Sequence, residues 1–135
     1  MAPRSAPTAV AAVLLLGWAG LIGYVSVPTL LSDEPFWDGG VSLLGAGLAV
    51  GHLAAAIGVV RRATWGRRLA LALGGIGLFG SGAVLITLIP GLDRAQELIG
   101  RLPLLVLAIP AGMVVSYALI VVALYRAGDE FSQVP

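Results

Sequence analysis

The sequence predicts an all-α integral membrane protein, a single polytopic domain over residues 1–135 in which four transmembrane helices form an antiparallel bundle. Hydrophobic residues make up 59% of the chain and charged residues only 11%, against about 25% charged in an average soluble domain. A membrane-spanning helix requires about 20 apolar residues. The windows that reach this length without aspartate, glutamate, lysine or arginine are Ala9–Val27, Val41–Val60, Leu69–Ile89 and Leu102–Tyr125.

The first expected span ends at Pro28 and the polar stretch Ser32–Pro35. A short basic start followed by an apolar run is also typical of a cleaved signal peptide. This run is long for that role, and no Ala-x-Ala cleavage pattern follows it. We therefore expect the first span to be retained.

The second and third expected spans are separated by the arginine-rich connector 61–68, and Pro90 and Gly91 end the third. Glycine is frequent in the third span, which places small residues on several of its faces. A helix of this kind packs against several neighbours, so we expect the third span to be central. The stretch Gly58–Gly74 is similar to connectors in small bacterial membrane proteins.

The loop before the fourth span carries a helical pattern of its own. Its apolar positions are 92, 95, 98 and 99, which fall on one face of a helix. Glu97 is spaced for side-chain pairing with Arg94 and Arg101. The pattern predicts a short amphipathic helix on the outer membrane surface, either as a plain connector or as a lid or docking element. Pro103 then begins the fourth span, where its missing N–H is not needed.

Positive charge is concentrated on one side of the predicted membrane. Six of the eight arginines belong to the N-terminus, the connector 61–68 and the C-terminal tail, whereas the first and third loops hold two arginines beside five acidic residues. Arginine excess marks the cytoplasmic side. We therefore expect a bacterial plasma-membrane protein with both termini cytoplasmic, Trp37 at the outer boundary, and Trp65 and Tyr125 at the inner one. We also expect the first eight residues and the tail 127–135 to be mobile.

Glycine rows give the strongest packing signal, because small residues let helices approach closely in a membrane. Gly47 and Gly51 lie one turn apart in the second span, Gly77 lies in the third, and Gly112 lies between small residues in the fourth. We expect these positions to pack helices together within the bundle. The alternatives are a homo-oligomer interface or a wall that slides during transport.

His52 is the single histidine and lies in the middle of a span, where an ionisable residue is a functional candidate. Counted from the inner ends of their spans, His52 and Tyr117 lie eight residues deep, and Ser116 and Trp18 nine. These depths correspond to about 12–14 Å, so the four side chains are expected in one layer. The layer is either a packed, neutral imidazole with a hydroxyl or carbonyl partner, or a ligand or pore contact. Haem ligation would need a second axial ligand such as Met113.

The residues that are absent exclude several kinds of chemistry. Without cysteine, the chain has no disulfide, thiolate metal site or thiol nucleophile. No span contains a carboxylate, and the sequence shows no catalytic triad, metal-ligand cluster or phosphate cradle. We therefore expect no catalytic residue, no metal and no cofactor. The net charge of +1 argues against a nucleic-acid partner.

The favoured function is that of a small non-enzymatic multi-pass membrane protein, an auxiliary or structural subunit of a membrane complex. One alternative is a small oligomeric transporter or channel, with Pro110 as a hinge and His52 as a polar pore group. A third hypothesis, a haem- or quinone-site electron-transfer subunit, depends on His52 alone. The expected partners are the lipid bilayer and either further copies of the chain or other membrane subunits.

Overall fold

The computed structural model describes residues 5–31, 39–91 and 102–131, and every regular element within them is a helix. Four long helices are apolar enough to span a membrane. The elements in chain order are α1 (Ala6–Leu30), α2 (Gly39–Val60), α3 (Thr64–Leu88), the 3₁₀ turn η1 (Ile89–Gly91), α5 (Leu102–Arg126) and the 3₁₀ turn η2 (Gly128–Phe131). The expected outer amphipathic helix and Trp37 lie outside the described residues.

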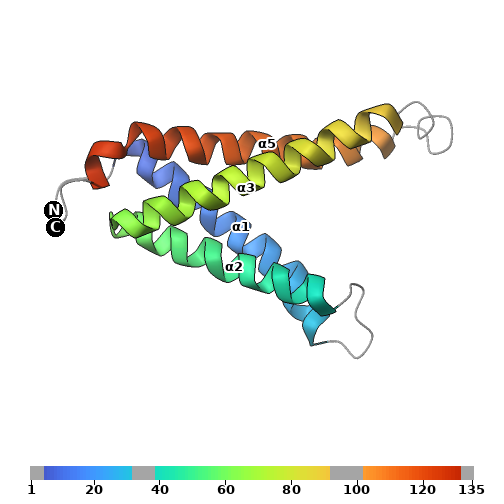
Figure 1. The fold of residues 1–135 in the computed structure, drawn as a ribbon, viewed down its shortest axis with the longest axis horizontal. Coiled ribbons are helices and arrows are strands. Elements are labelled where there is room, and N and C mark those ends of the chain that lie inside the picture. The colour runs from blue at the N-terminus through green and yellow to red at the C-terminus, as the bar shows by residue number, and fades with distance from the viewer. Residues whose placement is uncertain (1–4, 32–38, 92–101, 132–135) are drawn as a thin grey trace.

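The long helices form two hairpins, α1 with α2 and α3 with α5, which meet at one end and diverge toward the other (Figure 1). The contacts between the hairpins are made by α2 with α3 and by α1 with α5. A bundle is therefore formed only where the hairpins converge. The expectation that the third span is central is wrong, because α3 packs mainly against α2 and α5, just as α1 packs against α2 and α5.

The length of the helices suits this divergence. α1, α3 and α5 each contain 25 residues, which corresponds to roughly 37 Å at 1.5 Å per residue. The hydrocarbon core of a bilayer is only about 30 Å thick. A helix longer than the core is accommodated by tilting, so both hairpins can lean away from each other and still cross the membrane.

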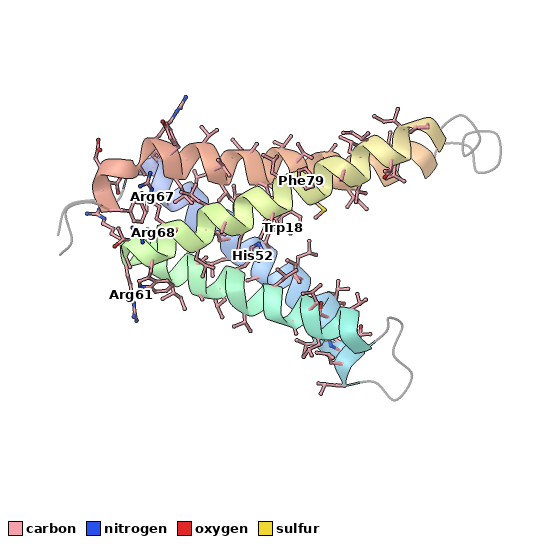
Figure 2. All side chains as sticks on the ribbon, viewed as in Figure 1. Trp18, His52, Arg61, Arg67, Arg68 and Phe79 are labelled. Carbon is pink, nitrogen blue, oxygen red and sulfur yellow. The ribbon has the colours of Figure 1, made fainter. Side chains whose placement is uncertain are left out.

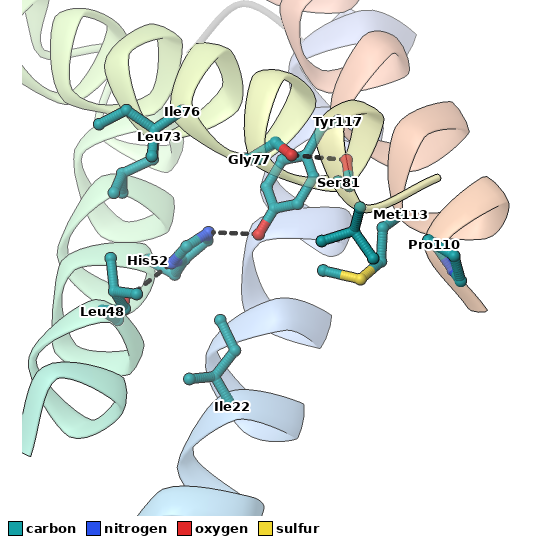
Figure 3. Close-up of a pocket in the computed structure, with 12 residues that line it drawn as sticks. Ile22, Leu48, His52, Leu73, Ile76, Gly77, Ser81, Pro110, Met113 and Tyr117 are labelled. Atoms are coloured by element: carbon teal, nitrogen blue, oxygen red, sulfur yellow. Dashed lines mark hydrogen bonds between the residues drawn. The ribbon is translucent and has the colours of Figure 1, made fainter. Parts of the chain in front are cut away.

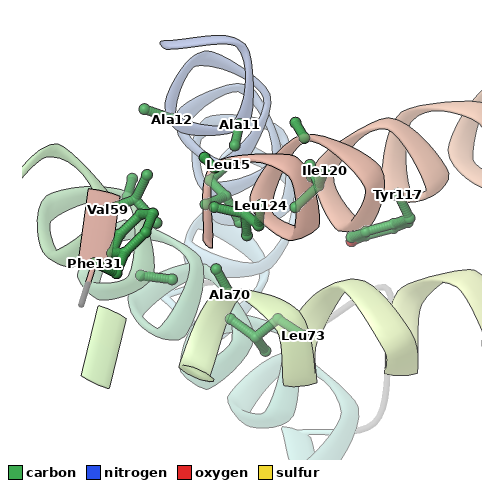
Figure 4. Packing of buried hydrophobic residues seen from close by; sticks show 14 residues of the cluster. Ala11, Ala12, Leu15, Val59, Ala70, Leu73, Tyr117, Ile120, Leu124 and Phe131 are labelled. Atoms are coloured by element: carbon green, nitrogen blue, oxygen red, sulfur yellow. The ribbon is translucent and has the colours of Figure 1, made fainter. Parts of the chain in front are cut away.

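The hydrophobic core lies at the convergent end, where all four long helices and η2 contribute side chains (Figure 4). Its buried members include Ala11, Leu15, Val59, Ala70, Ile120, Leu124 and Phe131. The start of α1 and the turn η2 lie at this end, and so do Arg61, Arg67 and Arg68 (Figures 1 and 2). The arginine-rich side of the molecule is therefore also the side where the hairpins are held together.

The beginning and the end of the chain are better packed than expected. Thr8 is fully buried, and α1 already begins at Ala6 behind the N-cap Ser5. Phe131 is 1% exposed, because η2 turns its ring into the core after α5 ends. The expectation of mobile segments is thus wrong for Ser5–Thr8 and for residues 127–131, because buried apolar and hydroxyl contacts hold them.

A tight turn joins α2 to α3. The N–H of Ala63 donates to the Gly58 carbonyl at 2.9 Å, and that of Arg62 donates to the Val59 carbonyl at 3.0 Å, which is a Schellman motif. Arg62 occupies the left-handed position of the motif with φ 56°, where glycine is usual. A side chain on Gly58 or Gly66 would overlap the backbone of the other, so both glycines are required for the two helices to come this close.

Several predicted span boundaries differ from the structure. Pro28 does not end the first span, because α1 continues to Leu30 with the proline in its last turn. Proline removes one helical hydrogen bond and its ring crowds the carbonyl four residues earlier, and α1 accordingly ends only two residues after Pro28. α3 begins at Thr64, five residues before the predicted start, since arginine is a good helix former and its charge remains at the membrane surface.

Candidate functional site

The structure brings together Trp18, Ser116, Tyr117 and His52, the four residues that the sequence placed at one depth. The rings of Trp18 and Tyr117 stack with centroids 5.0 Å apart and an angle of 8° between their planes. Trp18 Nε1 donates to Ser116 Oγ at 3.0 Å, and Ser116 donates in turn to the Met113 carbonyl at 3.0 Å. The layer therefore joins α1 to α5 by a ring stack and a chain of hydrogen bonds.

His52 joins α2 to α5 in the same layer, and only 2% of it is exposed (Figure 3). Its Nδ1 lies 2.8 Å from the Leu48 carbonyl oxygen, and its Nε2 lies 3.2 Å from the Tyr117 hydroxyl. A carbonyl oxygen can only accept, so Nδ1 carries the proton. In a neutral imidazole Nε2 is then the acceptor, and the Tyr117 hydroxyl donates to it.

Both ring nitrogens of His52 are engaged in this arrangement. An axial bond to haem iron needs a free ring nitrogen, and Nε2 is free only if the Tyr117 hydroxyl turns away. Among the described residues, no cluster of histidine, aspartate and glutamate has the make-up of a metal site. The geometry thus favours the interpretation of His52 as a hydrogen-bonded link between hairpins over that of an iron ligand.

Gly77 makes room for the Tyr117 ring. A Cβ at position 77 would overlap the ring of Tyr117, whose other contacts are Trp18 and His52. Because both hairpins hold the ring, it has little freedom to move away. Gly77 is therefore the glycine on which the geometry of the layer depends.

The other predicted packing glycines have different surroundings. A Cβ on Gly51 would make an ordinary contact with Leu73 at 3.7 Å. Gly47 and Gly112 would meet nothing within 4 Å, so packing within the described chain does not account for these two positions. Spacing along one helix identifies a row of small residues, but it does not show whether another helix faces that row.

A cavity of about 350 Å³ lies between the hairpins beside this layer (Figure 3). All four long helices contribute to its wall. The apolar part of the wall includes Ile22, Leu73, Ile76, Val84, Pro110 and Met113. The polar side chains at the wall are those of His52, Ser81 and Tyr117. The cavity is therefore an apolar space with a small polar group of side chains on one side.

Ser81 is a wall residue that the sequence analysis did not single out. It is 4% exposed, and its hydroxyl donates to the Gly77 carbonyl at 2.6 Å. A serine that bonds to its own helix gives no pattern in the sequence beyond being polar within an apolar span. Its position at the cavity is a consequence of how α3 is turned against α5.

A second polar cluster lies at the convergent end, where Glu130 and Arg62 are outside the spans and Thr8 is in the first turn of α1. Thr8 donates to Glu130 Oε2 at 3.0 Å, and Arg62 Nε lies 3.8 Å from the same oxygen. Hydrogen bonding by Ser5, then by Thr8, and the charge of Arg62 lower the pKa of Glu130 below its ordinary value of 4.5. This cluster attaches η2 to the start of α1 and to the turn between α2 and α3.

Arg67 supports the same attachment from α3. Its Nε donates to the Leu124 carbonyl at 3.2 Å, and its guanidinium lies 5.9 Å from the centre of the Phe131 ring. Arginine at a helix end can satisfy a terminal carbonyl of a neighbouring helix and stack on an aromatic ring at once. Arg67 therefore has a packing role in addition to its contribution to topology.

Comparison with known protein families, curated proteins and solved structures found no match to this chain.

Proposed function

We propose that this chain is a small multi-pass membrane protein without catalytic activity, which serves as an auxiliary subunit of a larger assembly in a bacterial plasma membrane, with both termini cytoplasmic. The observation that carries the proposal is the apolar opening between the diverging hairpins. We call this opening, which is the side of the cavity on which Ile22, Ile76 and Val84 lie, the notch. Ile76 is 66% exposed and Val84 is 50% exposed, so these notch side chains are uncovered within the chain.

A transmembrane helix of another protein suits the notch for two reasons. The convergent end is fixed by the buried core and by the Glu130 cluster, so the hairpins can remain apart elsewhere without losing their attachment. Gly80 at the notch wall has no neighbour within 4 Å of a would-be Cβ, which allows close approach of another backbone. Helix association in membranes depends on such close packing.

Site-specific photo-crosslinking tests this proposal. A photoreactive residue at Val84 is expected to give a discrete adduct with a different membrane protein in native membranes. The matched control is Phe79, which is 82% exposed on α3 and does not border the cavity. Adducts with lipid alone at both positions would contradict the proposal, and an adduct of two identical chains would favour a homo-oligomer.

A small oligomeric transporter or channel is the second candidate. It is favoured by the asymmetry of the molecule, in which the hairpins converge at the arginine-rich end and diverge toward the other, and by Pro110 in the cavity wall. The chain has no cysteine, so Gly80→Cys would provide a unique label. For a transporter we expect labelling from either side of the membrane with an impermeant maleimide, whereas a static subunit should label from one side at most.

A further inference from the structure

The polar side chains of the cavity present hydrogen-bond acceptors to an incoming molecule and no free donor. Tyr117 gives its hydroxyl proton to His52, and Ser81 gives its own to the Gly77 carbonyl. Both nitrogens of His52 are engaged, because Nδ1 donates to Leu48 and Nε2 accepts from Tyr117. The oxygens of Tyr117 and Ser81 each keep acceptor capacity.

The rest of the cavity suits an apolar molecule that arrives from the membrane. The volume of about 350 Å³ falls within the range of small-ligand pockets, roughly 300–1,000 Å³. The exposed wall residues Ile76 and Val84 connect the cavity to the notch. Met113 lies in the wall, and its flexible side chain can adjust to the shape of a guest.

We propose that this cavity binds a lipid-soluble molecule with an apolar body and a hydroxyl group, alcoholic or phenolic, which donates its proton to the oxygen of Tyr117 or Ser81. A hydrocarbon of the same size would leave those oxygens unused. A ketone or quinone carbonyl is itself an acceptor, so it would have to compete with His52 for the Tyr117 proton. The cavity therefore favours an alcohol or hydroquinone over the corresponding hydrocarbon, ketone or quinone.

The size of the preference follows from the worth of one neutral hydrogen bond. Such a bond corresponds to roughly 2- to 12-fold in affinity. We expect the alcohol to bind tighter than the hydrocarbon by this factor, with the ketone no tighter than the hydrocarbon. Binding in the cavity is a property of the isolated chain, so it is tested independently of the proposed subunit role.

Trp18 provides the signal for a binding experiment, because its ring stacks on Tyr117 beside the cavity. In a Trp37→Phe, Trp65→Phe background, Trp18 is the single tryptophan. The protein is placed in phosphatidylcholine nanodiscs and titrated with 1-decanol, 2-decanone and n-decane, with affinities expressed per mole fraction in the bilayer. A parallel titration with decylhydroquinone and decylquinone distinguishes a phenolic ligand from an aliphatic one. Equal affinities for 1-decanol and n-decane, or tighter binding of 2-decanone, would overturn the proposal.

Variants of the two acceptors test the polar contact. Tyr117→Phe keeps the ring and removes the hydroxyl, but it also frees Nε2 of His52 as an acceptor, so it is combined with His52→Leu. Ser81→Ala removes the other oxygen. We expect the preference for 1-decanol to fall toward 1-fold in the Tyr117→Phe, His52→Leu variant, in Ser81→Ala, or in the variant that combines all three changes. A preference that survives in the triple variant would show that the hydroxyl is recognised elsewhere and would overturn the assignment.

Two glycines of α3 give a matched pair that tests the location. Neither Gly80 nor Gly82 has a neighbour within 4 Å of a would-be Cβ, but only Gly80 lines this cavity. Gly80→Leu should abolish the Trp18 response to 1-decanol, whereas Gly82→Leu should leave it unchanged. An equal response in the two variants would mean that the alcohol binds outside the cavity, which contradicts the proposal.

Discussion

Replacing Gly77 by alanine should destabilise the protein far more than one added methyl group suggests. The new Cβ would overlap the Tyr117 ring, which is held by Trp18 on one side and by His52 at its hydroxyl. Overpacking of this kind costs about 1–3 kcal/mol. If the ring moves, a stack of about 0.5–1.5 kcal/mol and an interhelical hydrogen bond of about 0.6 kcal/mol are weakened as well.

Alanine also recovers up to about 1 kcal/mol of helix propensity over glycine. The expected net loss for Gly77→Ala is therefore about 1–4 kcal/mol in the free energy of unfolding. The control is Gly75→Ala on the same helix, where a Cβ meets nothing within 4 Å. Gly75→Ala should be neutral or slightly stabilising, because it gains propensity without a clash.

The measurement is reversible unfolding in mixed micelles of a mild detergent and SDS, followed by tryptophan fluorescence. A double-mutant cycle with Tyr117→Ala isolates the clash, because removal of the ring should bring the cost of Gly77→Ala down to that of Gly75→Ala. Equal unfolding free energies for Gly77→Ala and Gly75→Ala would refute the reasoning. A full cost that persists without the Tyr117 ring would show that another contact causes it.

Three further predictions follow from named contacts, and a fourth follows from the distribution of the arginines. Nitrogen NMR of labelled histidine should find the His52 proton on Nδ1, whereas a proton on Nε2 would contradict the bond to Tyr117. Folding lowers the pKa of the Glu130 carboxyl below 4.5, so the ionised side chain stabilises the folded state. This stabilisation is complete at pH values above 4.5 and is lost as the pH falls through the pKa of Glu130 in the folded protein. The free energy of unfolding, measured as a function of pH, should therefore decrease in acid, and this decrease should be smaller in Glu130→Gln. Arg62→Gly should be about 1 kcal/mol more stable than Arg62→Ala in the same unfolding assay, because only glycine adopts a φ of 56° freely. Both variants remove the ion pair with Glu130, so its loss cancels in the comparison. Equal stability of the two variants would contradict this prediction. A reporter fused after Thr64 should read cytoplasmic and one within residues 33–39 external, and the reverse pattern would overturn the orientation.

Composition and hydropathy alone determined that this chain has four apolar helices long enough to cross a membrane. These properties are local, because each helix satisfies its own backbone hydrogen bonds and its apolar length can be read from consecutive residues. Depth within a span is local as well, which is why counting residues brought His52, Tyr117, Ser116 and Trp18 to one layer.

The tertiary structure alone decided how the helices meet. In a membrane the hydrophobic effect does not direct helices toward each other, so their arrangement depends on the fit of individual side chains. That fit places Tyr117 against Gly77, leaves the Cβ position of Gly112 without a contact among the described residues, and brings Phe131 back into the core. The divergence of the hairpins, and with it the cavity, results from contacts between residues distant in sequence, which no hydropathy pattern encodes.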